Sequence, residues 1–116
     1  MVKPVGRGQM VKQKKLMPEY LKQRIIDALI DKHLQRVIVF GSYARGDYDQ
    51  YSDLDIIIVC DTQLPFVERF REFHQLFELP LAIELLVYTP QEFEGMIERE
   101  NPFIIQLLEH GIDILT

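Results

Sequence analysis

The residues best suited to chemistry form two short groups with ten residues between them. The first is Gly41-Ser42 and the second is Asp53-Leu54-Asp55. Residues two apart on a strand project to the same face, so Asp53 and Asp55 are predicted to point together. At about 4 Å and an effective dielectric near 20 their repulsion is roughly 4 kcal/mol, which a protein relieves by protonating one carboxylate or by placing a cation between them. Oxygen ligands without histidine favour Mg²⁺, with Mn²⁺ as the alternative.

A third acid, Glu84, lies inside the apolar segment LAIELLVY, where burial of an unpaired carboxylate would be costly. A helix between the second and third predicted strands makes a β-α-β crossover, which implies that these strands are parallel. If they are also adjacent, Glu84 lies alongside the two aspartates. Three carboxylates can hold two metal ions about 3.5–4 Å apart, the arrangement for in-line attack on a phosphoryl group.

Gly41 and Ser42 end one apolar strand and precede a helical turn. Backbone N–H groups and the serine hydroxyl at such a turn can approach phosphate oxygens, assisted by the partial positive charge at the start of the helix. Arg45, one turn later, either pairs with the same phosphates or forms a salt bridge with Asp47 or Asp49. Each motif alone is common, but their combination favours metal-dependent nucleotidyl transfer.

The other polar and aromatic residues near these motifs give weaker indications. Tyr43, Tyr48 and Tyr51 either stack on a nucleobase or line the loop, and the loop is preferred for the last two. The three histidines share no metal-ligand spacing. His110, near a predicted helix C-terminus, is more simply a partner of the helix dipole.

Helices and strands alternate along the chain, which is typical of an α/β or α+β domain. Strands are predicted over 36–41, 53–60, 81–88 and 112–115, and helices over 18–34, 65–78, 90–99 and 102–110. We therefore expect one small domain over residues 18–116, a mixed sheet flanked by helices, preceded by a flexible basic leader at 1–17.

Apolar periodicity and capping signals support the predicted helices. Leu21, Ile25, Leu29 and Ile30 mark one side of the first helix. In the second, four phenylalanines recur at spacings of four, three and four and are predicted to face the core, namely Phe66, Phe70, Phe73 and Phe77. The third begins with a capping box, Thr89 to Glu92, and the last begins at Asn101-Pro102 and ends at Gly111.

Composition excludes several classes of protein. A chain of 116 residues with 47% hydrophobic and 27% charged residues fits one globular domain with its own core. The single cysteine, Cys60, cannot form an internal disulfide, and no zinc-ligand spacing exists. No apolar run approaches the roughly 20 residues of a membrane helix, and no secretory signal follows the basic start. These features predict a cytoplasmic protein.

Charge is distributed unevenly along the chain. The first fifteen residues contain five Lys and Arg and no acid, whereas the remainder contains 8 basic and 18 acidic residues. The leader is interpreted as a solvated arm, and the acidic body is a poor surface for nucleic acid. Nucleic acid is therefore not expected as a partner.

At these motifs the sequence resembles the polymerase-beta-type nucleotidyltransferase superfamily, and within it the minimal nucleotidyltransferase (MNT) branch. The family pattern of Gly-Ser, a gap, Asp-x-Asp and a later acid between apolar residues matches Gly41-Ser42, Asp53, Asp55 and Glu84. The segments GSYARG and SDLDIIIV are similar to those of small MNT proteins encoded beside HEPN partners in prokaryotic toxin–antitoxin pairs. The likeness covers about residues 18–116. Glutamate at position 84, where aspartate is frequent, is a modest departure.

The resemblance implies a Mg²⁺-dependent enzyme that moves AMP from ATP to a hydroxyl, most simply a tyrosine on a HEPN-type toxin, so that the protein is an antitoxin. Asp53, Asp55 and Glu84 are then the catalytic metal ligands, and Glu84 also accepts the hydroxyl proton, directly or through water. The nucleotide is bound by Gly41, Ser42 and, on one of the two interpretations, Arg45.

Two other functions stay open at this point. One is a non-catalytic antitoxin that neutralises its partner by binding alone. The other is a subunit of a small-molecule nucleotidyltransferase whose acceptor-binding part comes from a second chain. The chain has no room for an acceptor-binding domain of its own, so all three functions require a partner or a further subunit.

Overall fold

A computed structural model of the protein describes residues 15–115. The predicted basic leader therefore falls largely outside the described residues, and only its last three residues are placed. Among the described residues, no helix is long and apolar enough to cross a membrane.

Four strands form one mixed sheet in the order β3-β2-β1-β4. Their bounds are β1 Arg36–Phe40, β2 Leu54–Val59, β3 Ile83–Tyr88 and β4 Ile112–Asp113. β2 is parallel to β3, whereas β1 is antiparallel to both β2 and β4. The predicted crossover, the adjacency of its two strands and the short C-terminal edge strand are confirmed, and so is the mixed-sheet fold class.

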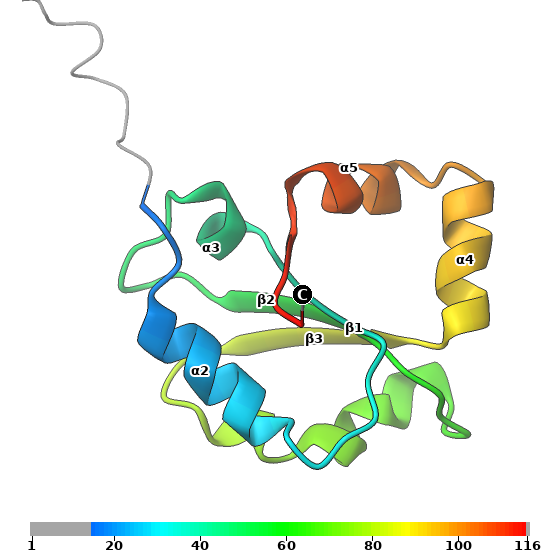
Figure 1. Cartoon of the computed structure of the whole chain (residues 1–116), viewed down its shortest axis with the longest axis horizontal. Coiled ribbons are helices and arrows are strands. Elements are labelled where there is room, and N and C mark those ends of the chain that lie inside the picture. The colour runs from blue at the N-terminus through cyan, green and yellow to red at the C-terminus, as the bar shows by residue number, and fades with distance from the viewer. Residues whose placement is uncertain (1–14, 116) are drawn as a thin grey trace, which may run out of the picture.

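Helices cover both faces of this sheet (Figure 1). α4 (Pro90–Glu98) and α5 (Pro102–His110) lie on one side, and α2 (Glu19–Ala28) lies on the other with the 3₁₀ helices η1 (Phe66–Phe73) and η2 (Leu76–Glu78). Because successive strand residues face opposite ways, the sheet contributes to two separate cores. Ile38, Ile57 and Val59 pack with α4 and α5, whereas their strand neighbours pack with α2, η1 and η2.

The first helix is shorter than its apolar pattern predicted. α2 ends at Ala28 rather than near Leu34, and residues 29–31 form a turn. Ile30, predicted on the apolar side, is 71% exposed. Leu29 is still buried as the C-cap of α2, and the chain then reverses to enter β1 at Arg36.

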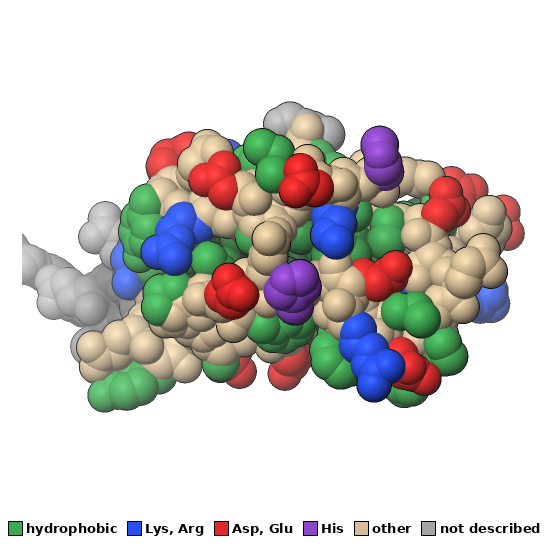
Figure 2. Space-filling view, turned by 90° about the horizontal axis from the view of Figure 1, so that it is seen from below, with side chains coloured by type: hydrophobic (Ala, Val, Ile, Leu, Met, Phe, Trp, Pro, Cys, Tyr) green, Lys and Arg blue, Asp and Glu red, His purple; other side chains and the backbone are tan. Residues whose placement is uncertain are grey.

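The predicted phenylalanine face is also wrong for three of its four members. Phe73 is 3% exposed, but Phe66, Phe70 and Phe77 are 42–50% exposed. The segment winds as 3₁₀ helix, with three residues per turn, so spacings of four, three and four do not fall on one face. Seen from below in Figure 2, apolar side chains are interspersed with acidic, basic and histidine side chains.

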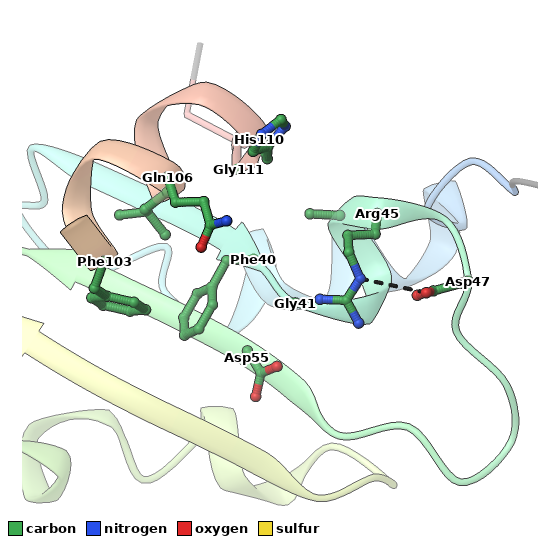
Figure 3. A pocket seen from close by; sticks show the side chains of 11 residues that line it. Phe40, Gly41, Arg45, Asp47, Asp55, Phe103, Gln106, His110 and Gly111 are labelled. Carbon is green, nitrogen blue, oxygen red and sulfur yellow. Dashed lines mark hydrogen bonds and ion pairs between the residues drawn. The ribbon is translucent and has the colours of Figure 1, made fainter.

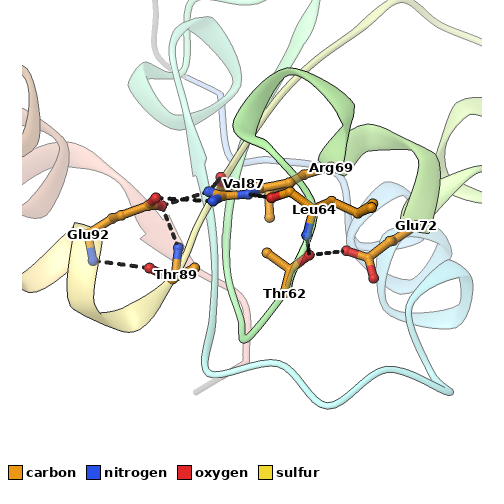
Figure 4. Close-up of polar contacts among 7 residues, drawn as sticks. All are labelled: Thr62, Leu64, Arg69, Glu72, Val87, Thr89 and Glu92. Carbon is orange, nitrogen blue, oxygen red and sulfur yellow. Dashed lines mark hydrogen bonds and ion pairs between the residues drawn. The ribbon is translucent and has the colours of Figure 1, made fainter.

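Arg69 on η1 takes a buried position that the aromatic pattern did not predict. Its guanidinium donates to the carbonyl oxygens of Leu64 and Val87 at 2.9 Å and to Glu92 at 2.6 and 3.1 Å (Figure 4). Glu92 also accepts from the Thr89 amide, which completes the predicted capping box at the start of α4. One buried cation therefore ties η1 to both β3 and α4.

Replacing Glu92 by glutamine is expected to lower the stability of the protein at about pH 7. It should also make that stability less dependent on pH in the acid range. Hydrogen bonds from Arg69, partly offset by burial and assisted by the Thr89 amide, lower the pKa of Glu92 from its ordinary value of 4.5. A depressed carboxyl pKa stabilises the fold above the ordinary pKa, and this contribution is lost as pH falls through the folded-state pKa. The thermal midpoints of Glu92→Gln and of the unaltered protein, measured from about pH 7 down into acid, should therefore differ near neutrality and converge in acid.

Glu94→Gln, at an exposed position of the same helix, is the control and should leave the midpoint unchanged. A Glu92→Gln midpoint equal to that of the unaltered protein at about pH 7 would contradict a contribution of this ion pair to stability.

Candidate active site

At the end of β1 the backbone approaches the side chain of Asp55. Gly41 has φ +73° and ψ −149°, a region that is essentially restricted to glycine. A β-carbon at this position would overlap Asp55 Oδ2. Glycine is therefore required both by the backbone conformation and by the space that the carboxylate occupies.

On the sheet, Asp55 lies between Phe40 on one neighbouring strand and Glu84 on the other. Its Cα pairs with that of Phe40 on β1 and with that of Glu84 on β3. Asp55 lies two residues from Ile57, which packs toward α5, so Asp55 faces the same side of the sheet. Two of the predicted site acids are thus brought together on one face at the end of the sheet nearest α3, while the third, Asp53, lies just before β2.

The three acids differ in exposure. Asp55 is half-buried, whereas Asp53 and Glu84 are exposed, so Glu84 does not carry the burial cost that its apolar neighbours suggested. Burial raises the pKa of Asp55, the charges of Glu84 and Asp53 raise it further, and Arg45 partly opposes them. Negative charge at Asp55 is therefore costly, and a cation would lower that cost.

The chemistry of this donor set fits a hard divalent cation. Its ligands are carboxylate oxygens, and Mg²⁺ is commonly held by one or two carboxylates together with substrate phosphates. Across residues 15–115, no three acidic, histidine or cysteine side chains form a ready-made metal cluster. Asp55 and Glu84, with Asp53 beside them, therefore suit a cation that arrives with a phosphate-bearing ligand.

α3 (Ser42–Arg45) is the helical turn predicted after Gly41-Ser42. The Gly41 carbonyl accepts from the amides of Ala44 and Arg45, and Gly46 ends the turn in a left-handed conformation. The Arg45 guanidinium lies 3.4 Å from Asp47, one of the two ion pairs considered from the sequence. Its side chain is 60% exposed and also lines the cavity described below.

Tyr43, on α3, packs against the core and against Tyr48 of the loop that follows. The Tyr43 and Tyr48 rings stack with centroids 4.5 Å apart, so Tyr48 covers one face of Tyr43. Tyr48 also donates to the Leu16 carbonyl and lies under the Lys15 ammonium, whose backbone amide donates to Gly46. Tyr51 is 82% exposed. Tyr48 thus lines the loop, as predicted, and Tyr43 does so with it.

A cavity of about 870 Å³ opens between α3, the Asp55 end of the sheet and α5. Gly41, Arg45 and Asp55 lie on one side of it (Figure 3). The other side is formed by Phe40 and by residues of α5, among them Phe103, Gln106 and His110. Motifs in the sequence did not identify these four residues as part of a site. The signal available was only their spacing on α5, which places positions 103, 106 and 110 on one helical face.

The family model for the nucleotidyltransferase domain matches residues 22–114 of this chain. The chain belongs to the nucleotidyltransferase domain family. The matched range contains the Gly41 turn, Asp53, Asp55, Glu84 and the whole sheet, so the family resemblance seen in the sequence is confirmed. The arrangement of Asp55 and Glu84 beside Gly41 is accordingly the candidate active site of a nucleotidyltransferase.

Similar proteins from two organisms are all named as protein adenylyltransferases. A Methanocaldococcus jannaschii protein named "Putative protein adenylyltransferase MJ0604" is 44% identical over 70% of this chain and 73% of its own length. A second from that organism, "Putative protein adenylyltransferase MJ0141", is 30% identical over 77% and 87%. The Haemophilus influenzae protein "Probable protein adenylyltransferase MntA" is 29% identical over 74% and 83%. This nucleotidyltransferase thus falls among proteins named as protein adenylyltransferases.

Two solved structures share the fold. One belongs to a crystal structure of a toxin–antitoxin with AMP-PNP, with a TM-score of 0.57 and 23% identity over 80% of this chain and 71% of that one. The other is the "Crystal structure of a putative nucleotidyltransferase from Sulfolobus solfataricus", with a TM-score of 0.53 and 22% identity over 84% of this chain and 78% of that one. These likenesses support the small mixed-sheet nucleotidyltransferase fold.

Proposed function

We propose that this nucleotidyltransferase is an antitoxin that transfers AMP from ATP to a tyrosine hydroxyl of a HEPN-type toxin. The observation that carries the proposal is the register of Asp55 and Glu84 beside the Gly41 turn. The names of the relatives support a protein as acceptor, and the toxin–antitoxin neighbour with AMP-PNP supports both the partner and the nucleotide.

In this proposal the Gly41 turn binds the triphosphate, and the acids at the end of the sheet bind the divalent cation. Gly41 and Ser42 bind the triphosphate through backbone N–H groups and the serine hydroxyl, and Arg45 exchanges its exposed pairing with Asp47 for a phosphate. Asp53, Asp55 and Glu84 hold Mg²⁺, or Mn²⁺ in its place. When bound, such an ion neutralises phosphate charge and lowers the pKa of a coordinated hydroxyl.

The transfer step forms one bond and breaks one. The acceptor hydroxyl oxygen bonds to the α-phosphorus of ATP, and the bond from that phosphorus to the oxygen bridging to the β-phosphate breaks, releasing pyrophosphate. Glu84 accepts the hydroxyl proton, directly or through one water. Glu84 is exposed beside Asp55, so an acceptor on a second protein can reach it.

Intact mass spectrometry of the co-purified toxin partner tests this function. After incubation with ATP and Mg²⁺, the partner should gain the mass of AMP, and a Tyr→Phe change at the modified residue should abolish the gain. Tight association with an unchanged partner mass would instead show neutralisation by binding alone. Labelling of an aminoglycoside with the partner unmodified would show a small-molecule transferase, and either result rejects the proposal.

A further inference from the structure

The triphosphate, cation and acceptor hydroxyl of the proposed transfer leave the α5 side of the cavity without a role. Phe103 and Gln106 stand one turn apart on α5 and both line the cavity that holds Gly41 and Asp55. Figure 3 shows the Phe103 ring beside Phe40 and the Gln106 side chain extending from α5 toward Phe40. The two residues thus form a continuous wall that faces the catalytic end of the sheet.

This wall includes an aromatic side chain, Phe103, that is only partly buried. Phe103 is 39% exposed although α5 packs Ile104 and Leu107 into the core. Its ring meets Phe40 edge to face, with centroids 5.5 Å apart and planes at 80°. In an edge-to-face contact one ring presents its edge to a face of the other, so Phe40 covers at most one face of Phe103 and leaves the other for a flat apolar ligand.

Gln106 adds polar groups that have no partner in the fold. The Gln106 side chain is exposed, and within residues 15–115 its amide takes part in no hydrogen bond or ring contact, so it is available to a ligand. A glutamine amide carries one acceptor oxygen and two N–H donors on adjacent atoms. It can therefore pair at once with a neighbouring donor and acceptor on the edge of a planar ligand.

The division of the cavity indicates which part of a nucleotide belongs at this wall. Charged and backbone groups at Gly41, Arg45 and Asp55 suit phosphates and a cation, whereas the two phenylalanines suit neither. A volume of about 870 Å³ is in the usual range of small-molecule pockets, about 300–1,000 Å³, and leaves room for a base beyond the phosphates.

We propose that α5 forms the nucleobase subsite of this enzyme and selects adenine. The base stacks on Phe103, Gln106 Oε1 accepts from adenine N6, and Gln106 Nε2 donates to N7. Guanine presents acceptors at both N7 and O6, so the same amide can satisfy only one of them. The inference rests on the proposed function because it assigns the base of the nucleotide used there.

Calorimetric titration of the full chain with ATP and with GTP, in Mg²⁺, tests the role of Gln106. Gln106→Met keeps the length of the side chain and removes both hydrogen-bonding groups. It should weaken ATP binding by about 5- to 100-fold and bring the ATP-to-GTP affinity ratio to within about twofold of one. Gln91→Met, the same change at an exposed position of α4 outside the cavity, should leave the ratio unaltered.

Phe103→Ala should weaken ATP and GTP alike by about 5- to 100-fold, because stacking does not depend on the edge of the base. Phe70→Ala is its matched control, since Phe70 is 50% exposed and also meets one ring, Phe77, edge to face, but lies outside the cavity. Thermal midpoints of all four variants establish that they are folded.

The outcomes separate this inference from the function on which it rests. An ATP-to-GTP ratio that Gln106→Met leaves intact, in a protein that still labels its partner, overturns the base assignment alone. The same holds if Phe103→Ala raises the KM for the partner without changing nucleotide affinity, since the ring then serves the acceptor. Failure of the unaltered protein to bind any nucleotide overturns both.

Discussion

Asp55→Asn is expected to abolish AMP transfer while leaving the protein folded. The amide cannot supply the charged oxygen ligand that a divalent cation needs, and such a cation contributes several kcal/mol to the reaction. Since each 1.4 kcal/mol is a factor of ten, the rate should fall by at least about 10³-fold. Radiolabel transfer from ATP labelled at the α-phosphate measures this loss.

The stability of the same variant should stay equal or rise. Burial and the neighbouring charges of Glu84 and Asp53 raise the pKa of Asp55, so the neutral amide removes an unfavourable charge. Asp31→Asn, at an exposed position in the turn after α2, is the control for both measurements. Full transfer by Asp55→Asn would reject the assignment of this residue as a metal ligand.

Gly41→Ala should impair both stability and activity. The alanine would adopt a backbone region that costs about 1–3 kcal/mol, and its β-carbon would displace the Asp55 carboxylate. A displacement on the order of 1 Å in an active site can cost about 10²-fold in rate. Denaturant unfolding and radiolabel transfer, measured on one preparation, give the two effects together.

Gly95→Ala supplies a matched control with the opposite sign. Gly95 lies within α4, and the nearest atom outside the helix backbone to a new β-carbon is Arg99 Nη1 at 3.1 Å, the end of a flexible side chain. Alanine should therefore stabilise the helix by up to about 1 kcal/mol and leave transfer unchanged. If Gly41→Ala also kept full transfer and stability, the close approach at Asp55 would have no functional meaning.

The part of the site on the sheet could be predicted because its signals are local. Apolar runs bounded by glycine and aspartate marked β1 and β2, and the long helical connection between β2 and β3 indicated that these two strands are parallel. These rules brought Glu84 near the aspartates. The register that sets Glu84 directly beside Asp55 could not be read from the sequence, since a shift of two residues would keep every apolar side chain on its own face.

The α5 wall could not be predicted because no local pattern distinguishes it. Phe103 and Gln106 look like ordinary surface positions of an amphipathic helix, and they reach the cavity only because Ile104 and Leu107 seat α5 on the sheet. The predicted phenylalanine face of η1 was wrong for a different reason. Its phenylalanine spacing suits an α-helix, but the buried guanidinium of Arg69 takes the inward position between Leu64 and Val87.

The contacts of Lys15 and Leu16 bear on how this chain should be trimmed for crystallisation. A shortened protein starting at Pro18 would lose the amide that donates to the Gly46 carbonyl and the carbonyl that accepts from the Tyr48 hydroxyl. Both losses would loosen the segment that follows α3, next to the proposed triphosphate. The cut therefore belongs before Lys15, even though the helical pattern begins three residues later.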